Sequence, residues 1–390
     1  MNMYKQHLIK MLLADRVGPV FVYRALSVLA GITDQSQVIA YYSQRHDELE
    51  SSLEAILGAD ARFFTSHGIC SASVAEKVQI AFQSIDIDHE MDLIADNAVS
   101  VDTCFDDEYP DLLKNIHAPP VALYRKGQAL GFNDQCLAVV GSRAASDYGM
   151  ACAELLLPHV VRSGWNLISG GALGIDTQAH KIAIECNGPT TVVLGSGLLH
   201  PYPYGNKALF ELIVGRGGTV LTPFHMEQRP ERGTFPARNR VIAGIAKACL
   251  VIEAATQSGA LITAAYALES GRTVCAVPGN ITSETSAGCN ELLRQGAALI
   301  TSPADLLLEL GCVEEEADSP AEDTVLLSQR SEFVQDREFF KFIGQNPRSE
   351  EEIAVFLQKT IPEVQSFLFD LQLEGKIQQQ FTGLWGLPAR

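Results

Sequence analysis

The middle of the chain, residues 134–301, alternates short β-branched apolar runs with longer segments whose apolar residues recur at helical spacing. The expected strands are Cys136–Val140, Asn166–Ser169, Thr190–Leu194, Thr219–Leu221, Ala248–Glu253, Thr273–Val277 and Ala298–Ile300. The expected helices are Tyr148–Arg162, Asp176–Glu185, Ala208–Val214, Leu261–Glu269 and Glu291–Gln295. This alternation predicts an α/β fold of the doubly wound, Rossmann-like type, in which a parallel sheet lies between two layers of helices.

Residues 1–95 have helical apolar spacing that is interrupted by short glycine-containing turns. One turn is Val17-Gly18-Pro19-Val20, and another is Ser66-His67-Gly68. We therefore expect an all-helical domain. Such turns occur in ordinary helical hairpins, and they also contact nucleic-acid backbones through amides at a helix start, so both interpretations stay open.

Four turns of small residues follow expected strands: Gly141-Ser142-Arg143, Gly170–Gly174, Gly195-Ser196-Gly197 and Ser258-Gly259-Ala260. The carboxyl ends of parallel strands meet at one edge of the sheet, where ligands bind in this fold class. Each turn precedes a helix, whose free amide groups attract anions. A single turn of this kind is typical of tight chain reversal, whereas four along one edge predict a row of phosphate-binding positions.

The segment Met226–Arg240, MEQRPERGTFPARNR, adds four arginines and Phe235 to this edge, and we interpret it as a loop. Arginine forks bind phosphate oxygens, and an aromatic ring stacks on an unpaired base. Alternatively, Arg238 and Arg240 cap helices or pair with interior carboxylates, for which Glu253 and Asp176 are available.

Net charge at first argues against a polyanion partner, because 29 basic and 47 acidic side chains give −18. The charge is unevenly distributed: residues 1–133 carry −8, residues 134–301 are neutral, and residues 302–390 carry −10. Acidic flanks around a neutral middle are compatible with a focused site that binds a few phosphates while the rest of the surface repels a polyanion.

The nine cysteines are scattered singly with no CxxC pair, which favours reduced thiols over a disulfide framework or a zinc site. The N-terminus lacks the apolar run of a signal peptide, and no stretch has the length of a membrane span. We expect a cytoplasmic protein that does not bind membranes and has no metal or cofactor.

Several enzyme classes are disfavoured by missing motifs. The first turn is not GxGxxG, and GxxxxGK[ST] and GxSxG are absent. Asp176 and His180 are one helical turn apart, but no nucleophile or metal partner accompanies them. The pattern predicts a binding site and no catalytic residues.

An ordered series of motifs resembles the DprA/Smf family of DNA-processing proteins: VVGSRAASDYG (139–149), SGGALGIDTQAH (169–180), LGSGLLHPYPYGN (194–206), FPARNRVIAG (235–244), VIEAATQSGALITAAYALESGR (251–272) and VPGNITSETSAGCNELLRQGA (277–297). The similarity begins with 105–127 and covers about residues 100–310. The resemblance implies a non-enzymatic mediator of natural transformation that binds single-stranded DNA as a homodimer, protects it and loads the RecA recombinase.

The resemblance also implies site residues and domains. The single-stranded DNA or phosphate site would contain Ser142, Arg143, Gly170, Gly171, Gly174, Gly195, Gly197, Lys207, Phe235, Arg238, Asn239, Arg240, Ser258, Gly259 and Thr263. The domains would be a helical SAM/helix-hairpin-helix-like domain (1–95), an extended Rossmann-like domain (100–310), an acidic linker (313–324) and a winged-helix-like, DML1-like domain (325–390). Two departures are Leu173, where many members have a cation that Lys207 could replace, and Thr222-Pro223, where Ser-Glu is usual.

Within residues 325–390, Ser349–Glu352 fits a helix start with an acidic first turn, and residues 373–377 with Phe381–Leu387 fit a two-stranded wing. The second expected helix, Pro362–Leu373, carries acidic residues and no basic one. A protein contact or regulatory role is favoured over the reading of duplex DNA.

The alternative function is a nucleotide-processing hydrolase of the lysine-decarboxylase-like Rossmann group, which would use the same turns for a nucleoside phosphate. Those hydrolases carry PGGxGTxxE. The nearest string here, Pro278-Gly279-Asn280, lacks the following glycine and glutamate.

Overall fold

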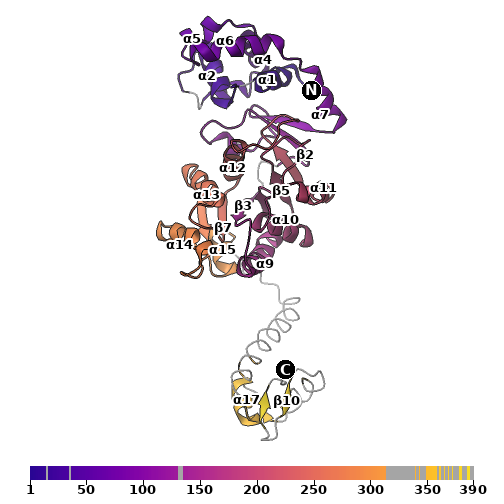
Figure 1. The fold of residues 1–390 in the computed structure, drawn as a ribbon, viewed down its shortest axis with the longest axis vertical. Coiled ribbons are helices and arrows are strands. Elements are labelled where there is room, and N and C mark those ends of the chain that lie inside the picture. Colours follow the sequence, from indigo (N-terminus) through magenta and orange to yellow (C-terminus); the bar gives the residue numbers. More distant parts are fainter. Residues whose placement is uncertain are drawn as a thin grey trace. The chain divides into compact units, whose positions relative to one another are not determined.

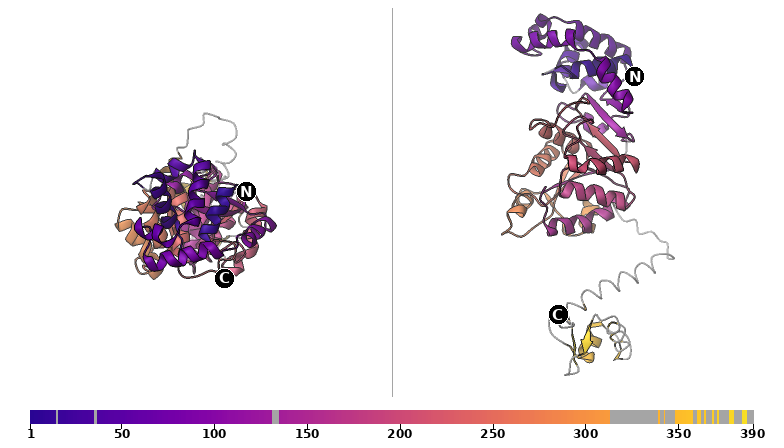
Figure 2. Two further views of the ribbon diagram at one scale, coloured as in Figure 1. Left: turned by 90° about the horizontal axis from the view of Figure 1, so that it is seen from above. Right: turned by 45° about the vertical axis from the view of Figure 1, so that its right-hand side comes forward.

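A computed structural model describes residues 1–14, 16–34, 37–130, 135–312, 339, 342, 348–357, 360, 361, 364, 368, 371, 377–379 and 384–386. The chain divides into two compact units, Met1–Val313 and Glu314–Arg390. The N-terminal helices and the central sheet both lie in the first unit (Figures 1 and 2). In the described part of the chain, no helix has the length and apolar character needed to cross a membrane.

Seven helices precede the first strand: α1 (Met3–Leu12), α2 (Pro19–Ala30), α3 (Gln37–Tyr42), α4 (His46–Gly58), α5 (Ala61–Ser66), α6 (Ala72–Ser84) and α7 (Asp88–Asp96). The predicted turns are confirmed: Gly18 precedes α2, whose first residue is Pro19, and His67 and Gly68 separate α5 from α6. Proline suits a first helical position because the amide that it lacks would have no helical partner.

Helix α1 is fixed to the α/β part by a buried carboxylate. Asp106, which follows β1, accepts from the Tyr4 hydroxyl and pairs with Lys5 at 2.8 Å. The hydroxyl and ammonium hydrogen bonds lower the pKa of Asp106 against the opposing effect of burial, which is the largest of these influences. The predicted division near residues 95–100 therefore lies inside one compact unit, and the domain boundary stays a prediction.

The central sheet has nine strands in the order β1-β2-β6-β5-β4-β3-β7-β8-β9. Their bounds are β1 (Ser100–Thr103), β2 (Ala122–Gly127), β3 (Cys136–Gly141), β4 (Asn166–Ser169), β5 (Thr190–Val193), β6 (Thr219–Thr222), β7 (Ala248–Ile252), β8 (Thr273–Ala276) and β9 (Ala298–Leu299). Strands β3 to β9 pair in parallel, which confirms the predicted doubly wound sheet. Strands β1 and β2, absent from the sequence prediction, extend it in antiparallel fashion.

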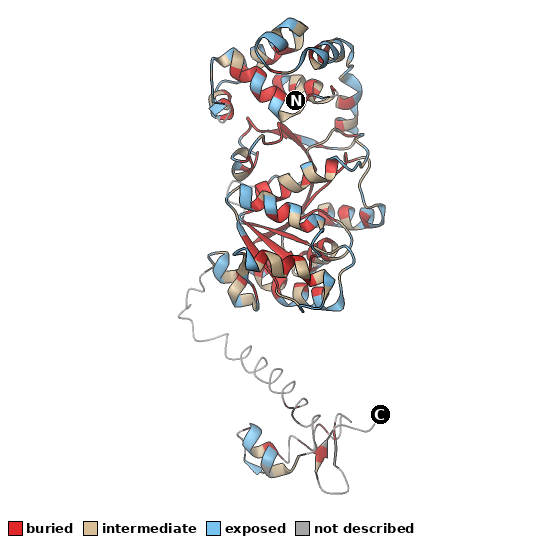
Figure 3. Cartoon of the chain, turned by 60° about the vertical axis from the view of Figure 1, so that its left-hand side comes forward, coloured by how far each residue is buried: buried red, intermediate tan, exposed pale blue. Residues whose placement is uncertain are grey.

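Helices cover both faces of the sheet. They are α8 (Asp111–Lys114), α9 (Asp147–Arg162), α10 (Ile175–Glu185), α11 (Lys207–Gly215), α12 (Thr234–Ile245), α13 (Gly259–Glu269), α14 (Ala287–Arg294) and α15 (Pro303–Glu309), with 3-10 turns at Tyr204–Asn206 and Glu284–Ser286. In β3, Leu137 and Val139 pack with residues of α9 and α10, and Ala138 and Val140 pack toward α12 and α13. Both faces of the strand are buried, which explains its continuous apolar run (Figure 3).

Helix α12 corrects the interpretation of Met226–Arg240 as a loop. The loop ends at Gly233, and Arg238 and Arg240 lie on the helix that follows. Pro236 occupies the third position of α12, where the missing amide has no helical partner, so the proline does not break the helix.

The second unit contains α17 (Glu350–Leu357), β10 (Gln378–Gln379) and β11 (Trp385–Gly386), and the two strands pair antiparallel. The predicted helix start at Ser349–Glu352 is confirmed by reciprocal bonds: the Glu352 amide donates to Ser349 Oγ, and the Ser349 amide donates to the Glu352 carboxylate. The predicted linker 313–324 and most of the second helix and wing lie outside the described residues. The winged-helix assignment stays a prediction.

Candidate nucleic-acid interface

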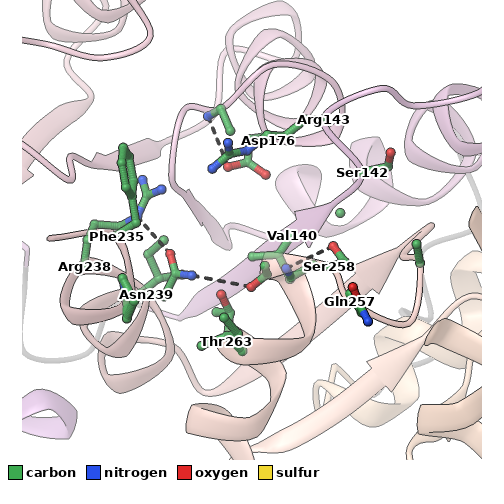
Figure 4. Close-up of a pocket in the computed structure, with 18 of the residues that line it drawn as sticks. Val140, Ser142, Arg143, Asp176, Phe235, Arg238, Asn239, Gln257, Ser258 and Thr263 are labelled. Carbon is green, nitrogen blue, oxygen red and sulfur yellow. Dashed lines mark hydrogen bonds between the residues drawn. The ribbon is translucent and has the colours of Figure 1, made fainter. Parts of the chain in front are cut away.

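A cavity of about 610 Å³ opens at the carboxyl ends of β3 and β7. These neighbouring strands mark the point where the order of the sheet reverses direction, since β4 follows on one side and β8 on the other. Crevices at such points are where open α/β sheets bind ligands. Eight predicted site residues line the cavity: Ser142, Arg143, Phe235, Arg238, Asn239, Ser258, Gly259 and Thr263 (Figure 4).

Arg143 is an exposed cation of this cavity and lies on the turn that follows β3. Its guanidinium carbon lies 5.9 Å from the centre of the Phe235 ring, and no carboxylate pairs with it in the described part of the chain. A backbone hydrogen bond fixes the turn to α10: the Ile175 amide at the start of α10 donates to the Ser142 carbonyl at 3.2 Å. Arg143 therefore stands at the surface on a fixed backbone, available to an anion.

Arg238 is buried and its guanidinium points inward. Nη1 donates to the carbonyl oxygens of Gly170 at 2.5 Å and Val193 at 2.6 Å, and Nε donates to Asn239 Oδ1 at 3.0 Å. Burial lowers the pKa of Arg238 to about 10, against the attraction of Asp176, which raises it. Arg238 is thus turned to the interior, where it hydrogen-bonds to backbone carbonyls and to Asn239, with no carboxylate ion pair in the described residues, and it joins α12 to the ends of β4 and β5. A contact between Arg238 and DNA stays a prediction.

Asp176 supplies the negative charge that faces Arg238 inside the protein. Its carboxylate accepts from the amides of Gly170 and Ala172, each at 3.2 Å. Burial raises the pKa of Asp176, and the attraction of Arg238 and the amide hydrogen bonds act in the opposite direction. Because this carboxylate is satisfied by backbone donors, its role here is to hold the Gly170–Gly174 turn.

His180 does not bond to Asp176, although the two residues are one helical turn apart. Thr190 Oγ1 donates to the Leu167 carbonyl at 2.8 Å, so the 2.7 Å contact with His180 Nδ1 requires the imidazole to donate. Nε2 is then an unprotonated, buried nitrogen that has no hydrogen-bond partner among the described residues. Burial, with a smaller contribution from Arg238, lowers the pKa of His180 to about 3. The ring is therefore neutral at ordinary pH.

The start of α13 forms the second wall of the cavity. Ser258 caps the helix by accepting from the Ala260 amide at 3.2 Å, and Asn239 Nδ2 donates to the Gly259 carbonyl at 3.5 Å. A Cβ at Gly259 would have no other atom within 4 Å. The helix start thus faces open space in the cavity that Arg143 also lines, and it suits an anion.

The other predicted glycines face protein and not the cavity. A Cβ at Gly170 would contact the Arg238 guanidinium, one at Gly174 the Ser142 carbonyl, and one at Gly195 the Phe235 ring. Gly171 is packed in the same way against Phe210, and Gly197 against the backbone at His225 and Met226. These five glycines let the turns pack closely on α12 and on one another, so that they position Arg143 and Phe235.

Two predicted residues lie away from the cavity. Lys207 starts α11, forms a loose 4.0 Å pair with Glu211 and lines a separate cavity of about 430 Å³. Arg240 lies over the Tyr266 ring at 5.3 Å and lines a third cavity, of about 260 Å³, next to α2. The observed partner of Arg240 is therefore an aromatic ring, and not the interior carboxylate that the sequence alternative expected.

Arg232 and Gln257 line the main cavity but were not among the predicted site residues. Arg232 is exposed and belongs to the arginine-rich segment, whose composition was the available signal. No group of three or more His, Cys, Asp or Glu side chains among the described residues is arranged to hold a metal ion.

The sequence of this chain is similar to those of known DNA-processing proteins. The family described as DNA recombination-mediator protein A matches residues 100–311. Protein Smf of Escherichia coli (strain K12) is 36% identical over 271 residues, which cover 69% of this chain and 72% of that protein. Protein Smf of Synechocystis is 41% identical over 212 residues, about half of the length of each.

A DNA-processing protein of known structure is similar to this chain in both sequence and fold. The DNA processing protein DprA of Streptococcus pneumoniae is 42% identical over 204 residues, 52% of this chain and 72% of the relative. Its X-ray structure superimposes with a TM-score of 0.59 at 32% identity and covers 75% of this chain and 97% of that one.

Proposed function

This chain belongs to the DNA recombination-mediator protein A family, also called DprA/Smf, and on that premise we propose that it binds single-stranded DNA through the cavity at β3 and β7. The observation that carries the proposal is the position of Arg143. It is an exposed guanidinium with no carboxylate partner in the described residues, it lies over the Phe235 ring, and it lines the same cavity as the open start of α13.

Each part of this arrangement meets a need of a nucleic-acid strand. Arginine and helix-start amides bind phosphate oxygens, and an aromatic ring accepts an unpaired base. A base in a duplex is stacked and paired, so Phe235 favours single strands. The neutral middle of the chain between flanks of −8 and −10 supports contact confined to a few nucleotides.

The proposed function also includes a homodimeric state and an action on the RecA recombinase. We propose that the protein acts as a homodimer that protects the strand and loads RecA onto it, as the family's description as a recombination mediator suggests. Dimers would place two short sites on one strand, which raises the overall affinity through the effective local concentration of the second site.

The test is equilibrium binding of the full chain to a labelled oligothymidylate and to a duplex of the same length, across a salt series. We expect preference for the single strand and a fall of log K with log salt that reflects a few phosphate contacts. Equal affinity for the duplex would contradict the proposal. A nucleotide-hydrolysis assay run in parallel tests the hydrolase alternative, and turnover of a nucleoside phosphate without single-strand preference would support it.

Recombinase loading needs its own assay. RecA filament formation on a strand already coated by single-strand binding protein is expected to accelerate when this chain is added. Acceleration that disappears together with DNA binding in an Arg143 variant would tie loading to the cavity. DNA binding without any effect on RecA would contradict the loading step alone.

A further inference from the structure

Three aromatic rings form a continuous row that leads out of the cavity at β3 and β7. The Tyr202 ring lies 5.8 Å from the Phe235 ring, and the Tyr204 ring lies 6.0 Å from the Tyr202 ring, measured between centres. Arg143 lies over Phe235 at the inner end of this aromatic row. Lys207 follows Tyr204 by three positions at the outer end.

Tyr202 and Tyr204 leave a large part of their side chains exposed to solvent instead of burying it in the protein. Tyr202 is 39% exposed and Tyr204 is 64% exposed. The ring planes meet at 63° and 82°, so the rings do not stack face to face on one another. Neighbouring large aromatic rings that stay exposed at the surface are typical of binding surfaces.

The loop that carries the tyrosines is held at both ends. On the side before them, the Gly197 amide donates to the Gln228 carbonyl at 2.8 Å, and the Leu199 amide donates to the Met226 carbonyl at 3.1 Å. On the side after them, buried Asn206 donates from Nδ2 to the Gly171 carbonyl and to Thr177 Oγ1, each at 2.8 Å. A ring that is already positioned loses little conformational freedom when a ligand binds.

We propose that Tyr202 and Tyr204 are base-stacking residues that extend the single-strand path from the cavity toward Lys207. This inference rests on the proposed function and adds the direction of the path. Neighbouring bases in B-form DNA are about 3.4 Å apart along the axis. Rings spaced at 5.8 and 6.0 Å therefore receive successive bases only from a strand whose bases have separated, which is a single strand.

A basic side chain lies at each end of the proposed path from the cavity to Lys207. Arg143 binds phosphate at the inner end, and exposed Lys207, in its loose pair with Glu211, is free to exchange that partner for a phosphate at the outer end. Between them the tyrosines contribute no charge. The central part of the path should therefore recognise bases, and the two ends should recognise the backbone.

The experiment compares two oligonucleotides of equal length and charge, an oligothymidylate and an abasic strand, against the full-length protein and the variants Tyr202→Ala, Tyr204→Ala and the double variant. Base stacking is worth about 1–3 kcal/mol per base, so each single variant should weaken oligothymidylate binding about fivefold or more. Binding of the abasic strand and the salt slope should stay unchanged. Tyr202→Phe and Tyr204→Phe should bind as the parent does, since the ring and not the hydroxyl makes the contact.

A second readout reports proximity directly. The two native tryptophans, Trp165 and Trp385, are buried, so Tyr204→Trp adds an exposed fluorophore to the row. Oligothymidylate should quench it at the concentrations at which binding occurs. Leu155→Trp on α9, at a position 54% exposed and outside the row, serves as the matched control and should not respond.

The outcomes separate this inference from the proposed function. Absence of single-strand binding by the parent protein overturns both. Parent binding that weakens in Arg143→Ala but is unchanged in the tyrosine variants, with no quenching of Tyr204→Trp, overturns the aromatic path and leaves the proposed function standing. Equal losses on the abasic and thymidine strands also overturn it, because they indicate a backbone contact or a disturbed fold.

Discussion

Arg238 Nη1 donates to the carbonyl oxygen of Gly170 at 2.5 Å, and a side chain at Gly170 would collide with that guanidinium. Arg238 and Gly170, whose motifs suggest direct phosphate contacts, thus contact each other inside the protein and connect α12 to the turn after β4. Arg143 and the start of α13 remain exposed in the cavity, as does Arg232. Substitution of a residue that builds the cavity should change stability first, and substitution of a residue that touches DNA should change binding first.

Arg143→Ala should weaken single-strand binding across sequences and reduce the slope of log K against log salt by about one, because one phosphate contact is lost and no base contact is. The measurement is anisotropy of labelled oligonucleotides at several salt concentrations. Arg294→Ala, which removes an exposed arginine paired with Glu291, is the control and should leave the slope unchanged. An unaltered slope for Arg143→Ala would contradict the assignment of the cavity.

Arg238→Met should act first on stability. It leaves the carbonyls of Gly170 and Val193 without their donor and Asp176 without its facing charge, and each buried polar group left without its partner typically costs about 1–3 kcal/mol. Urea unfolding measures the loss, and adding Asp176→Asn should recover part of it. A variant with the parent's unfolding curve and a smaller salt slope would show instead that Arg238 contacts phosphate.

Two glycine substitutions should have opposite consequences. Gly174 has φ +77° and faces the Ser142 carbonyl, so Gly174→Ala should lower the free energy of unfolding by more than about 1 kcal/mol. Gly259 lies at the open start of α13, so Gly259→Ala should leave stability unchanged or raise it by up to about 1 kcal/mol, yet weaken single-strand binding by filling the cavity. Undiminished binding by Gly259→Ala would argue against a ligand at this helix start.

His180 should make stability depend on pH. Its folded pKa of about 3 is below the ordinary 6.5, so the unfolded chain binds the proton more readily. The contribution of His180 is complete above pH 6.5 and is lost as the pH falls from 6.5 toward 3, which amounts to about 2 kcal/mol by pH 5. Asp176, whose pKa burial raises, acts in the opposite sense and favours the folded state at low pH.

The difference between parent and His180→Gln isolates the histidine, because the carboxylates are common to both. Urea unfolding between pH 4 and 7.5 should show a shallower decline below pH 6.5 in the variant. Parallel curves would indicate that His180 titrates normally in the folded protein.

Local pattern determined much of the fold. The seven predicted strands match β3 to β9 within one residue at each end. The signal is clearest in the central strands β3 and β7, because a strand buried on both faces shows as a continuous apolar run. Strand β2, ALYRKG, has no such run, and its strand conformation depends on antiparallel pairing with β1 and β6, which are distant in sequence. Helix α12 was missed because Gly233 and Pro236 are typical of loops when tertiary packing is unknown.

Local sequence pattern is enough to predict that small-residue turns, arginines and an aromatic residue gather at the carboxyl edge of a parallel sheet, because each turn directly follows a strand along the chain. Which of these residues face outward depends on the packing of the folded chain. Arg143 and Arg238 are equivalent as residue types, but one stands over an open cavity and the other fills the space that Gly170 leaves. The direction of a side chain depends on contacts between segments far apart in sequence, and no local pattern records those contacts.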